Sequence, residues 1–179
     1  VSADLNYRKK LWTPEKANQV MSGLMEYVDV VIGNEEDAEK VFGIKAAATD
    51  ITSGRLSEEG YREVAKQLAD RFGLEKVAIT LRESLSASDN NWSALLYDGR
   101  EYYRSRIYQV HIVDRVGGGD SFAGGLIYAL LSGKSTKEAL EFAVAASCLK
   151  HTIFGDFNLV SVEEVENLAG GDTSGRVQR

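Results

Sequence analysis

The residues best suited to chemistry are three consecutive glycines followed by an aspartate: Gly117, Gly118, Gly119 and Asp120. Apolar residues follow at once, which predicts a helix that starts here and ends at Gly133. Glycines let the backbone turn sharply and let a ligand approach bare N–H groups. Because the N–H groups of a first helical turn lack partners and carry partial positive charge, the run predicts a site for an anion such as phosphate.

Asp120 places a negative charge where the anion would bind, and two interpretations are open. The carboxylate either caps the helix or acts as a base beside a transferring phosphate. Phosphoryl transfer depends mainly on positioning and charge stabilisation, so backbone amides, a metal and one base are sufficient parts. The dinucleotide fingerprint G-x-G-x-x-G is not matched in spacing, and the triphosphate loop G-x-x-x-x-G-K-[ST] is absent, which argues against a NAD(P) enzyme.

The elements that must position this run alternate between strand and helix, which predicts an α/β domain with a largely parallel sheet. Helix starts are expected from their capping residues, and Asp98-Gly99 predicts a hairpin between residues 92–97 and 101–108. Residues 44–56 are expected to form an exposed polar connection and residues 84–91 a polar loop. The buried strands are expected at residues 1–6, 27–32 and 76–81, and the helix caps at Thr13, Asn34, Ser57, Ser135 or Thr136, and Ser161.

Charged residues follow three of these strands, at the sheet edge where ligands of parallel sheets bind. The segment 7–10 carries three positive charges, residues 35–37 carry three acids, and Arg82 follows the third strand. A solvated loop explains the first cluster equally well. The helix dipole alone explains acids in a first turn, and holding Mg²⁺ through water is the functional alternative.

The composition fits one globular domain with a core: 179 residues, 44% hydrophobic and 27% charged. A net charge of −6 argues against non-specific nucleic-acid binding, although not against small anionic ligands. No apolar run approaches the ~20 residues of a membrane span, and residues 1–4 do not begin a signal peptide. Cys148, the single cysteine, cannot form an internal disulfide, so we expect a buried structural thiol and a reducing, cytoplasmic compartment.

Residues 114–125 resemble the second signature of the ribokinase-like (PfkB) carbohydrate kinases, D-T-x-G-A-G-D-x-F. Arg115 stands for the usual Thr and Gly118 for the usual Ala, and neither change removes an amide or the base. Residues 33–37 resemble the family motif N-x-x-E, with the shorter Asp37 in the last position. Residues 4–8 resemble D-x-N-x-R, while residues 155–158 and 174–179 look most like 2-keto-3-deoxygluconate kinases.

The resemblance implies a Rossmann-like three-layer sandwich of the ribokinase type. Residues 1–169 would form its nucleotide-binding and catalytic portion, and residues 170–179 a Gly-rich polar tail. The resemblance covers only the carboxyl-terminal half of such a kinase. The amino-terminal strands, the small β lid and the Gly-Gly sugar motif of the family are therefore missing from the match. The start at Val1 leaves open a fragment or a processed product, and a homo-oligomer stays open because family members often use the lid.

The activity implied by the resemblance is transfer of the γ-phosphoryl group of ATP to a primary hydroxyl of 2-keto-3-deoxygluconate. Asp120 would be the base and the amides of Gly117, Gly118 and Gly119 the anion hole. Arg8 and Asn6 would contact the acidic sugar. Two alternatives remain: a kinase for another sugar, of the fructose or ribose type, or a catalytically incomplete nucleotide-binding fragment.

The resemblance also implies where cofactors would bind. Glu36 and Asp37 would organise Mg²⁺ through water. Asp114 would lie beside a monovalent cation such as K⁺ in members that hold one. The residues expected to border ATP are Asn34, Thr80, Arg82, Gly117, Gly119 and Ser147.

Overall fold

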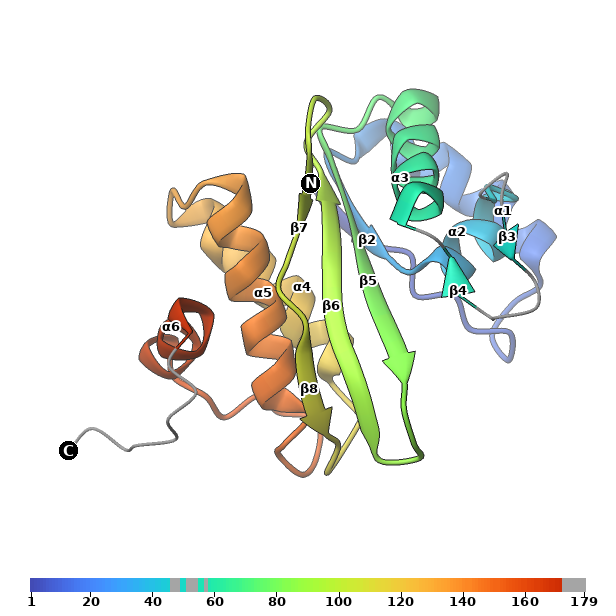
Figure 1. Cartoon of the computed structure of the whole chain (residues 1–179). Helices are drawn as coiled ribbons and strands as arrows, with labels where there is room; N and C mark the ends of the chain where they lie inside the picture. Colours follow the sequence, from blue (N-terminus) through green and yellow to red (C-terminus); the bar gives the residue numbers. More distant parts are fainter. Residues whose placement is uncertain (46–48, 51–54, 57, 172–179) are drawn as a thin grey trace. The chain divides into compact units, whose positions relative to one another are not determined.

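The computed structural model describes residues 1–45, 49–50, 55–56 and 58–171. The chain divides into two units, Val1–Leu81 with Ala94–Arg104, and Arg82–Ser93 with Ser105–Arg179. Strands β5 (Lys76–Ser84) and β6 (Asp89–Tyr97) contribute residues to both units. The predicted α/β class is confirmed (Figure 1).

The first unit contains the parallel part of the sheet. Strands β1 (Ser2–Asp4) and β2 (Val30–Gly33) pair in parallel, and β2 pairs in parallel with β5. The end of β6 pairs antiparallel with β7 (Tyr102–Arg104) across the predicted Asp98-Gly99 turn. The expectation that β1 is buried was wrong: it lies at the edge of the sheet, and Ser2 and Asp4 are exposed.

Four helical segments accompany these strands: α1 (Pro14–Leu24), the 3-10 turn η1 (Met25–Tyr27), α2 (Glu35–Phe42) and α3 (Glu58–Phe72). The predicted caps at Thr13 and Asn34 are confirmed, since each side chain accepts an N–H of the first helical turn. The predicted cap at Ser57 lies outside the described residues. Within the expected polar connection, β3 (Thr49–Asp50) and β4 (Arg55–Leu56) pair antiparallel.

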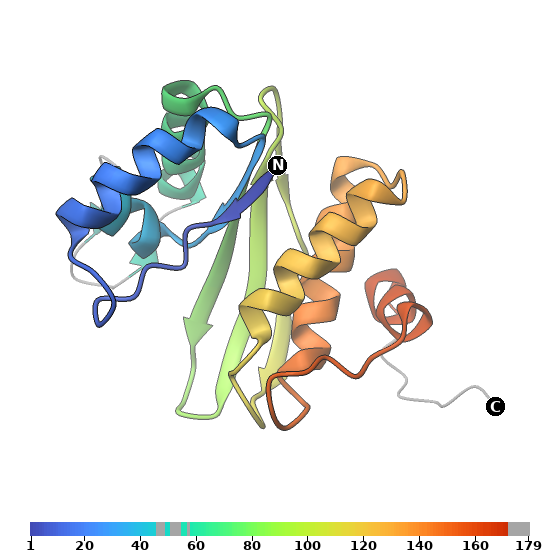
Figure 2. The ribbon, with the colours of Figure 1, turned by 180° about the vertical axis from the view of Figure 1, so that it is seen from behind.

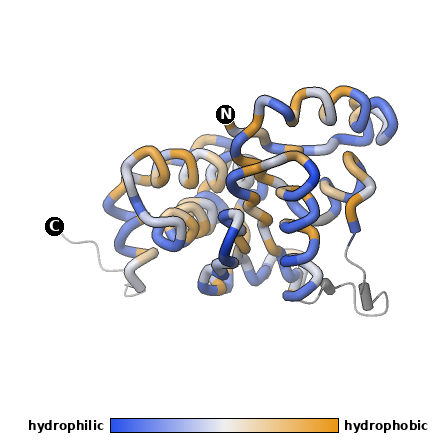
Figure 3. Tube along the Cα trace, turned by 90° about the horizontal axis from the view of Figure 1, so that it is seen from above, coloured by the Kyte–Doolittle hydropathy of each residue, from blue (hydrophilic) through white to orange (hydrophobic). Residues whose placement is uncertain are grey.

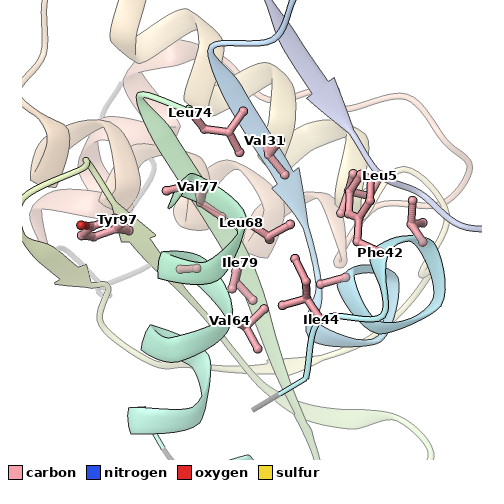
Figure 4. Close-up of a cluster of buried hydrophobic side chains, with 14 of the residues drawn as sticks. Leu5, Val31, Phe42, Ile44, Val64, Leu68, Leu74, Val77, Ile79 and Tyr97 are labelled. Carbon is pink, nitrogen blue, oxygen red and sulfur yellow. The ribbon is translucent and has the colours of Figure 1, made fainter. Parts of the chain in front are cut away.

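The core of this unit forms where the helices cover the sheet. Figure 4 shows a cluster of buried side chains that includes Val64 and Leu68 of α3, Phe42 of α2, and Val31 and Ile79 of the strands. All five side chains are at most 5% exposed. Hydrophobic and hydrophilic residues alternate along the helices (Figure 3), as expected for elements with one buried face. Burial of this apolar surface is the main force that holds the strand ends in place.

In the described residues, the second unit contains three helices, the end of β5, the start of β6 and one further strand. The start of β6 pairs with β8 (Tyr108–His111), with Trp92 opposite Tyr108. Helices α4 (Gly118–Leu131) and α5 (Thr136–Lys150) lie side by side (Figure 2), and α6 (Val162–Gly170) packs on α5. The predicted caps Ser135 and Ser161 are confirmed, each in a capping box.

The hairpin between β5 and β6 is longer than the sequence predicts. Strand β5 continues past the predicted end at Leu81 to Ser84, and β6 already begins at Asp89. The turn is closed by the N–H groups of Leu85 and Ser86, which donate to the carbonyl of Asp89 at 2.9 and 3.0 Å. Arg82 therefore lies within a strand rather than after it. Among the described residues, no helix is long and apolar enough to cross a membrane.

Candidate functional site

The glycine loop, residues 114–120, turns sharply at Gly117. Gly117 is the N-cap of α4 and has a φ of 80°, in the left-handed region that favours glycine. A Cβ at this position would lie only 2.2 Å from the carbonyl oxygen of Asp156. The loop therefore packs directly on the backbone of the 155–156 turn, and only glycine permits that approach.

Two buried side chains of the α5 end hold the next residue of the loop. The Ser147 hydroxyl donates to the Gly118 carbonyl at 2.7 Å, and Nδ1 of His151 lies 2.7 Å from the Ser147 carbonyl oxygen. The His151 ring also lies 2.8 Å from the place that a Cβ on Gly118 would occupy. Ser147 therefore supports the glycine loop in this structure, and its predicted contact with ATP stays a prediction.

Asp114 joins the start of the glycine loop to the 155–156 turn. Its Oδ1 accepts the Val116 N–H at 3.0 Å and its Oδ2 accepts the Gly155 N–H at 2.9 Å. These N–H donors, followed by the charge of Lys150, hold the pKa of the Asp114 carboxyl below its usual value. Asp114 is thus an ionised clamp between two backbone segments.

The first turn of α4 presents unpaired backbone donors. The Gly118 N–H reaches the Arg115 carbonyl at 3.4 Å, whereas in the part of the chain that the structure describes the Gly119 and Asp120 N–H groups have no acceptor. Gly117 and Gly118 are buried, while Gly119 and Asp120 are exposed. The donors that a ligand can reach are therefore those of Gly119 and Asp120.

The structure speaks against Asp120 as a helix cap. Asp120 occupies the third position of α4, as Asp37, Glu138 and Glu164 do in α2, α5 and α6. Those three acids each close a capping box, but the N-cap of α4 is a glycine without a side chain, and Asp120 forms no such box. No donor among the described residues bonds to the Asp120 carboxylate, so it remains available to a ligand.

A groove of about 390 Å³ lies beside Asp120 in the same unit. Asn158 is one of its lining residues: its Nδ2 donates to the Ala146 carbonyl at 3.2 Å, and its buried Oδ1 has no donor within the described ranges. Sequence reasoning missed this groove, although the 155–158 motif was a signal for it. The lining includes Asp120, Gly124, Tyr128, Phe142, Ala146, Asp156, Phe157 and Asn158.

In the first unit, Asp37 ties α2 to the segment that follows β1. Its Oδ2 accepts the Asn34 N–H at 3.3 Å, and its Oδ1 accepts the Tyr7 N–H at 3.1 Å. The Asn34 side chain in turn accepts the Asp37 N–H at 2.8 Å. Burial raises the pKa of the Asp37 carboxyl, while these two N–H donors and the charge of Arg8 oppose the rise.

The segment from Asn6 to Arg8 has a defined shape. Asn6 has a φ of 36°, the one positive value among the described non-glycine residues, and its N–H donates to Asp4 Oδ1 at 3.1 Å. Arg8 is exposed, and its Nη1 donates to the Tyr7 carbonyl at 3.2 Å. The first unit therefore brings Asn6 and Arg8 together with the Asp37 carboxylate.

The remaining predicted residues fall in one unit or the other. Thr80 Oγ1 donates to the Gly33 carbonyl at 3.4 Å in the first unit, and Glu36 is exposed there. Arg82 is exposed in the second unit, with the glycine loop. The described residues contain no cluster of three or more His, Cys, Asp or Glu side chains that could hold a metal by themselves.

Comparison with known proteins gives one consistent result. The family model of pfkB family carbohydrate kinases matches residues 1–160. A 2-dehydro-3-deoxygalactonokinase from Haloferax volcanii is 32% identical over 170 residues, which are 94% of this chain and 47% of that protein. The chain thus spans about half the length of the curated relatives that it matches.

Solved structures show the same fold. The crystal structure of 2-dehydro-3-deoxygluconokinase from Thermotoga maritima is 51% identical, with a TM-score of 0.89 over 96% of this chain and 50% of that one. A protein from E. coli assigned as ribokinase II, solved in complex with ATP and Mg²⁺, is 21% identical with a TM-score of 0.69, over 94% of this chain and 48% of that one. At that identity the second likeness shows the fold alone.

Proposed function

The chain belongs to the pfkB family of carbohydrate kinases, and from this premise we propose that it forms the phosphoryl-transfer part of an ATP-dependent kinase for 2-keto-3-deoxygluconate. The observation that carries the proposal is the start of α4. There the Asp120 carboxylate has no hydrogen-bond partner in the described structure. The N–H groups of Gly119 and Asp120 are likewise unpaired, and both residues are exposed.

In the proposed reaction, Asp120 accepts the proton of the attacking sugar hydroxyl as the phosphoryl group is transferred. The N–H groups of Gly119 and Asp120 stabilise the charge on the phosphoryl oxygens, because they are already oriented and need no rearrangement. Asp114, Ser147 and His151 hold the loop in that orientation through the contacts described above.

The groove beside Asp120 supports ATP as the donor. Aromatic side chains of Tyr128, Phe142 and Phe157 provide apolar surface for a purine ring. Asn158 lines the same groove, although its Oδ1 is buried and has no donor among the described residues. Contacts of ATP with Asn34, Thr80, Arg82, Gly117 and Ser147 remain predictions from the family motifs.

Mg²⁺, when bound with ATP, neutralises charge on the phosphates and keeps most of its water ligands. Such an ion needs only one or two carboxylates of the protein. It does not require a cluster of three or more ligands, and the described residues contain none. Glu36 is exposed and fits a contact through water, whereas both oxygens of Asp37 already accept backbone N–H groups. We therefore assign the Mg²⁺ role to Glu36 and a supporting role to Asp37.

The acidic sugar is assigned from Arg8 and Asn6. The Arg8 guanidinium is exposed and has donors left for a carboxylate, and Asn6 lies two residues away. The names of the relatives above, a deoxygalactonokinase and a deoxygluconokinase, support a 2-keto-3-deoxy sugar acid. A kinase of this type belongs in the cytoplasm, and the free, buried thiol of Cys148 fits that compartment.

A kinase assay with ATP and Mg²⁺ tests the proposal, using 2-keto-3-deoxygluconate, 2-keto-3-deoxygalactonate, fructose and ribose as acceptors. We expect the sugar acids to be phosphorylated in preference to fructose and ribose. Titration calorimetry of this chain with Mg-ATP is the companion measurement. Binding of Mg-ATP without phosphorylation of any acceptor would favour a catalytically incomplete nucleotide-binding module, and preference for a neutral sugar would contradict the assignment of Arg8.

A further inference from the structure

Lys150, the last residue of α5, is completely buried, with a relative exposure of 0%. Lysine is almost never fully buried unless its amine has a partner, because taking the charge out of water is costly. Its Nζ donates to the Ile153 carbonyl at 3.0 Å, and the Ile153 N–H donates back to the Lys150 carbonyl at 3.0 Å. The amine therefore closes the turn that follows α5.

This turn leads directly to the contacts of the glycine loop. Gly155 donates to Asp114, and the carbonyl of Asp156 lies against Gly117. The charge of Lys150 also acts on Asp114 and contributes to the lowered pKa of that carboxyl, after the N–H groups of Val116 and Gly155. Through this turn, the buried amine supports the loop whose Gly119 and Asp120 N–H groups are unpaired among the described residues.

The family resemblance implies a monovalent cation beside Asp114. The residues at this place do not fit such an ion. Such an ion needs carbonyl and carboxylate oxygens as ligands. Here the Lys150 amine already takes the Ile153 carbonyl and brings a positive charge to Asp114. A second cation beside Asp114 would face repulsion from the charge of Lys150, which already acts on that carboxylate.

We propose that the ammonium of Lys150 replaces the monovalent cation, holding the 150–155 turn and Asp114 in place so that the glycine loop needs no K⁺. Lys150 is then a positioning residue, because it acts through Asp114 and the turn and not on the reacting atoms. The simpler alternative is an ordinary lysine at a helix end, where it complements the dipole. That alternative gives Lys150→Ala no dependence on the choice of cation, and Lys137, exposed in the first turn of the same helix, is the control for removal of a lysine that the fold does not bury.

Thermal unfolding of this chain in KCl and in tetramethylammonium chloride, at equal ionic strength, tests the proposal without requiring kinase activity. We expect the Tm of the wild-type chain to be the same in both salts. Lys150→Ala should lower the Tm by at least about 5 °C in tetramethylammonium chloride, and K⁺ or NH₄⁺ should restore part of the loss. Lys137→Ala should change little in any of these salts.

Two results would overturn the proposal. The first is a wild-type chain that K⁺ stabilises more than tetramethylammonium does, which would show a cation site still in use. The second is a Lys150→Ala variant whose Tm is insensitive to the choice of cation. If Lys150→Ala does not fold, the salt response of the wild-type chain and of Lys150→Met decides: the proposal requires no K⁺ effect on the wild type and a lower Tm for Lys150→Met.

Discussion

The ring of His151 packs against the α-carbon of Gly118, leaving only 2.8 Å to the position that a Cβ would occupy. The same ring lies 4.9 Å from the Trp92 ring, centroid to centroid, and its Nδ1 contacts the Ser147 carbonyl. The helix that carries Asp120 therefore starts against a buried imidazole. Because of this contact, packing requires a glycine at position 118. The next residue, Gly119, has no such contact, so a side chain there has room.

Gly118→Ala is expected to destabilise the chain by about 1–3 kcal/mol, because the new methyl group overlaps the His151 ring. Gly119→Ala is the matched control: its Cβ would meet nothing within 4 Å, and alanine favours the helix. Urea unfolding of both variants measures the difference. Equal stability of the two variants would show that the His151 contact does not constrain the loop.

The stability of the chain should fall as His151 becomes protonated. Burial, followed by the charges of Lys150, Arg115 and Arg82, lowers the pKa of His151 below its usual value. As the pH falls, His151 therefore binds a proton at a higher pH in the unfolded chain than in the folded chain. The contribution of the neutral His151 to the free energy of unfolding is full above about pH 6.5, and it is lost as the pH falls from there toward the pKa of the folded chain.

The free energy of unfolding, measured between about pH 7.5 and pH 5, checks this expectation. His151→Gln should flatten the pH dependence over that range, whatever its effect on absolute stability. His111→Gln, which removes the only other histidine, should leave the dependence in place. A wild-type profile that does not change over this interval would refute the burial argument.

Local signals in the sequence were sufficient for the helix starts but not for the long-range contacts. Thr13, Asn34, Ser135 and Ser161 were predicted as caps because each acts on N–H groups of its own first turn. The extent of β5 was missed because Arg82 is exposed, and only its pairing with β6 keeps it in a strand.

The candidate site shows the same division. The glycines and Asp120 could be found from their spacing, but the partners that shape them are distant in sequence. Asp156 lies 39 residues beyond Gly117, and the Tyr7 N–H that occupies Asp37 lies 30 residues before it. The full burial of Lys150 likewise depends on packing that no local pattern reports.

Asp120→Asn is expected to lower the turnover number by about 10²–10⁴-fold in the sugar-kinase assay, because an amide cannot accept the proton. The KM for ATP and the stability should change little, since no described residue hydrogen-bonds to the Asp120 carboxylate. Glu163→Gln, an exposed acid in the first turn of α6, controls for loss of a charge near a helix start. Near-normal turnover of Asp120→Asn would rule out its role as the base.

Arg8→Ala is expected to raise the KM for sugar acids by roughly 10-fold, the loss of one charge-assisted contact of about 1.5 kcal/mol. The KM for neutral sugars should change much less, because they offer no carboxylate to the guanidinium. Lys9→Ala, an exposed neighbouring cation, tests whether net charge alone is responsible. Similar losses for acidic and neutral sugars would count against Arg8 as the carboxylate contact.

Cys148 is 8% exposed, and burial raises the pKa of its thiol to about 11. At neutral pH the thiol is therefore almost entirely protonated, and thiol-reactive dyes act on the thiolate. A cysteine introduced at an exposed position can then be labelled selectively without first removing the native one. The chain is in this sense already prepared for fluorescence measurements of nucleotide or sugar binding.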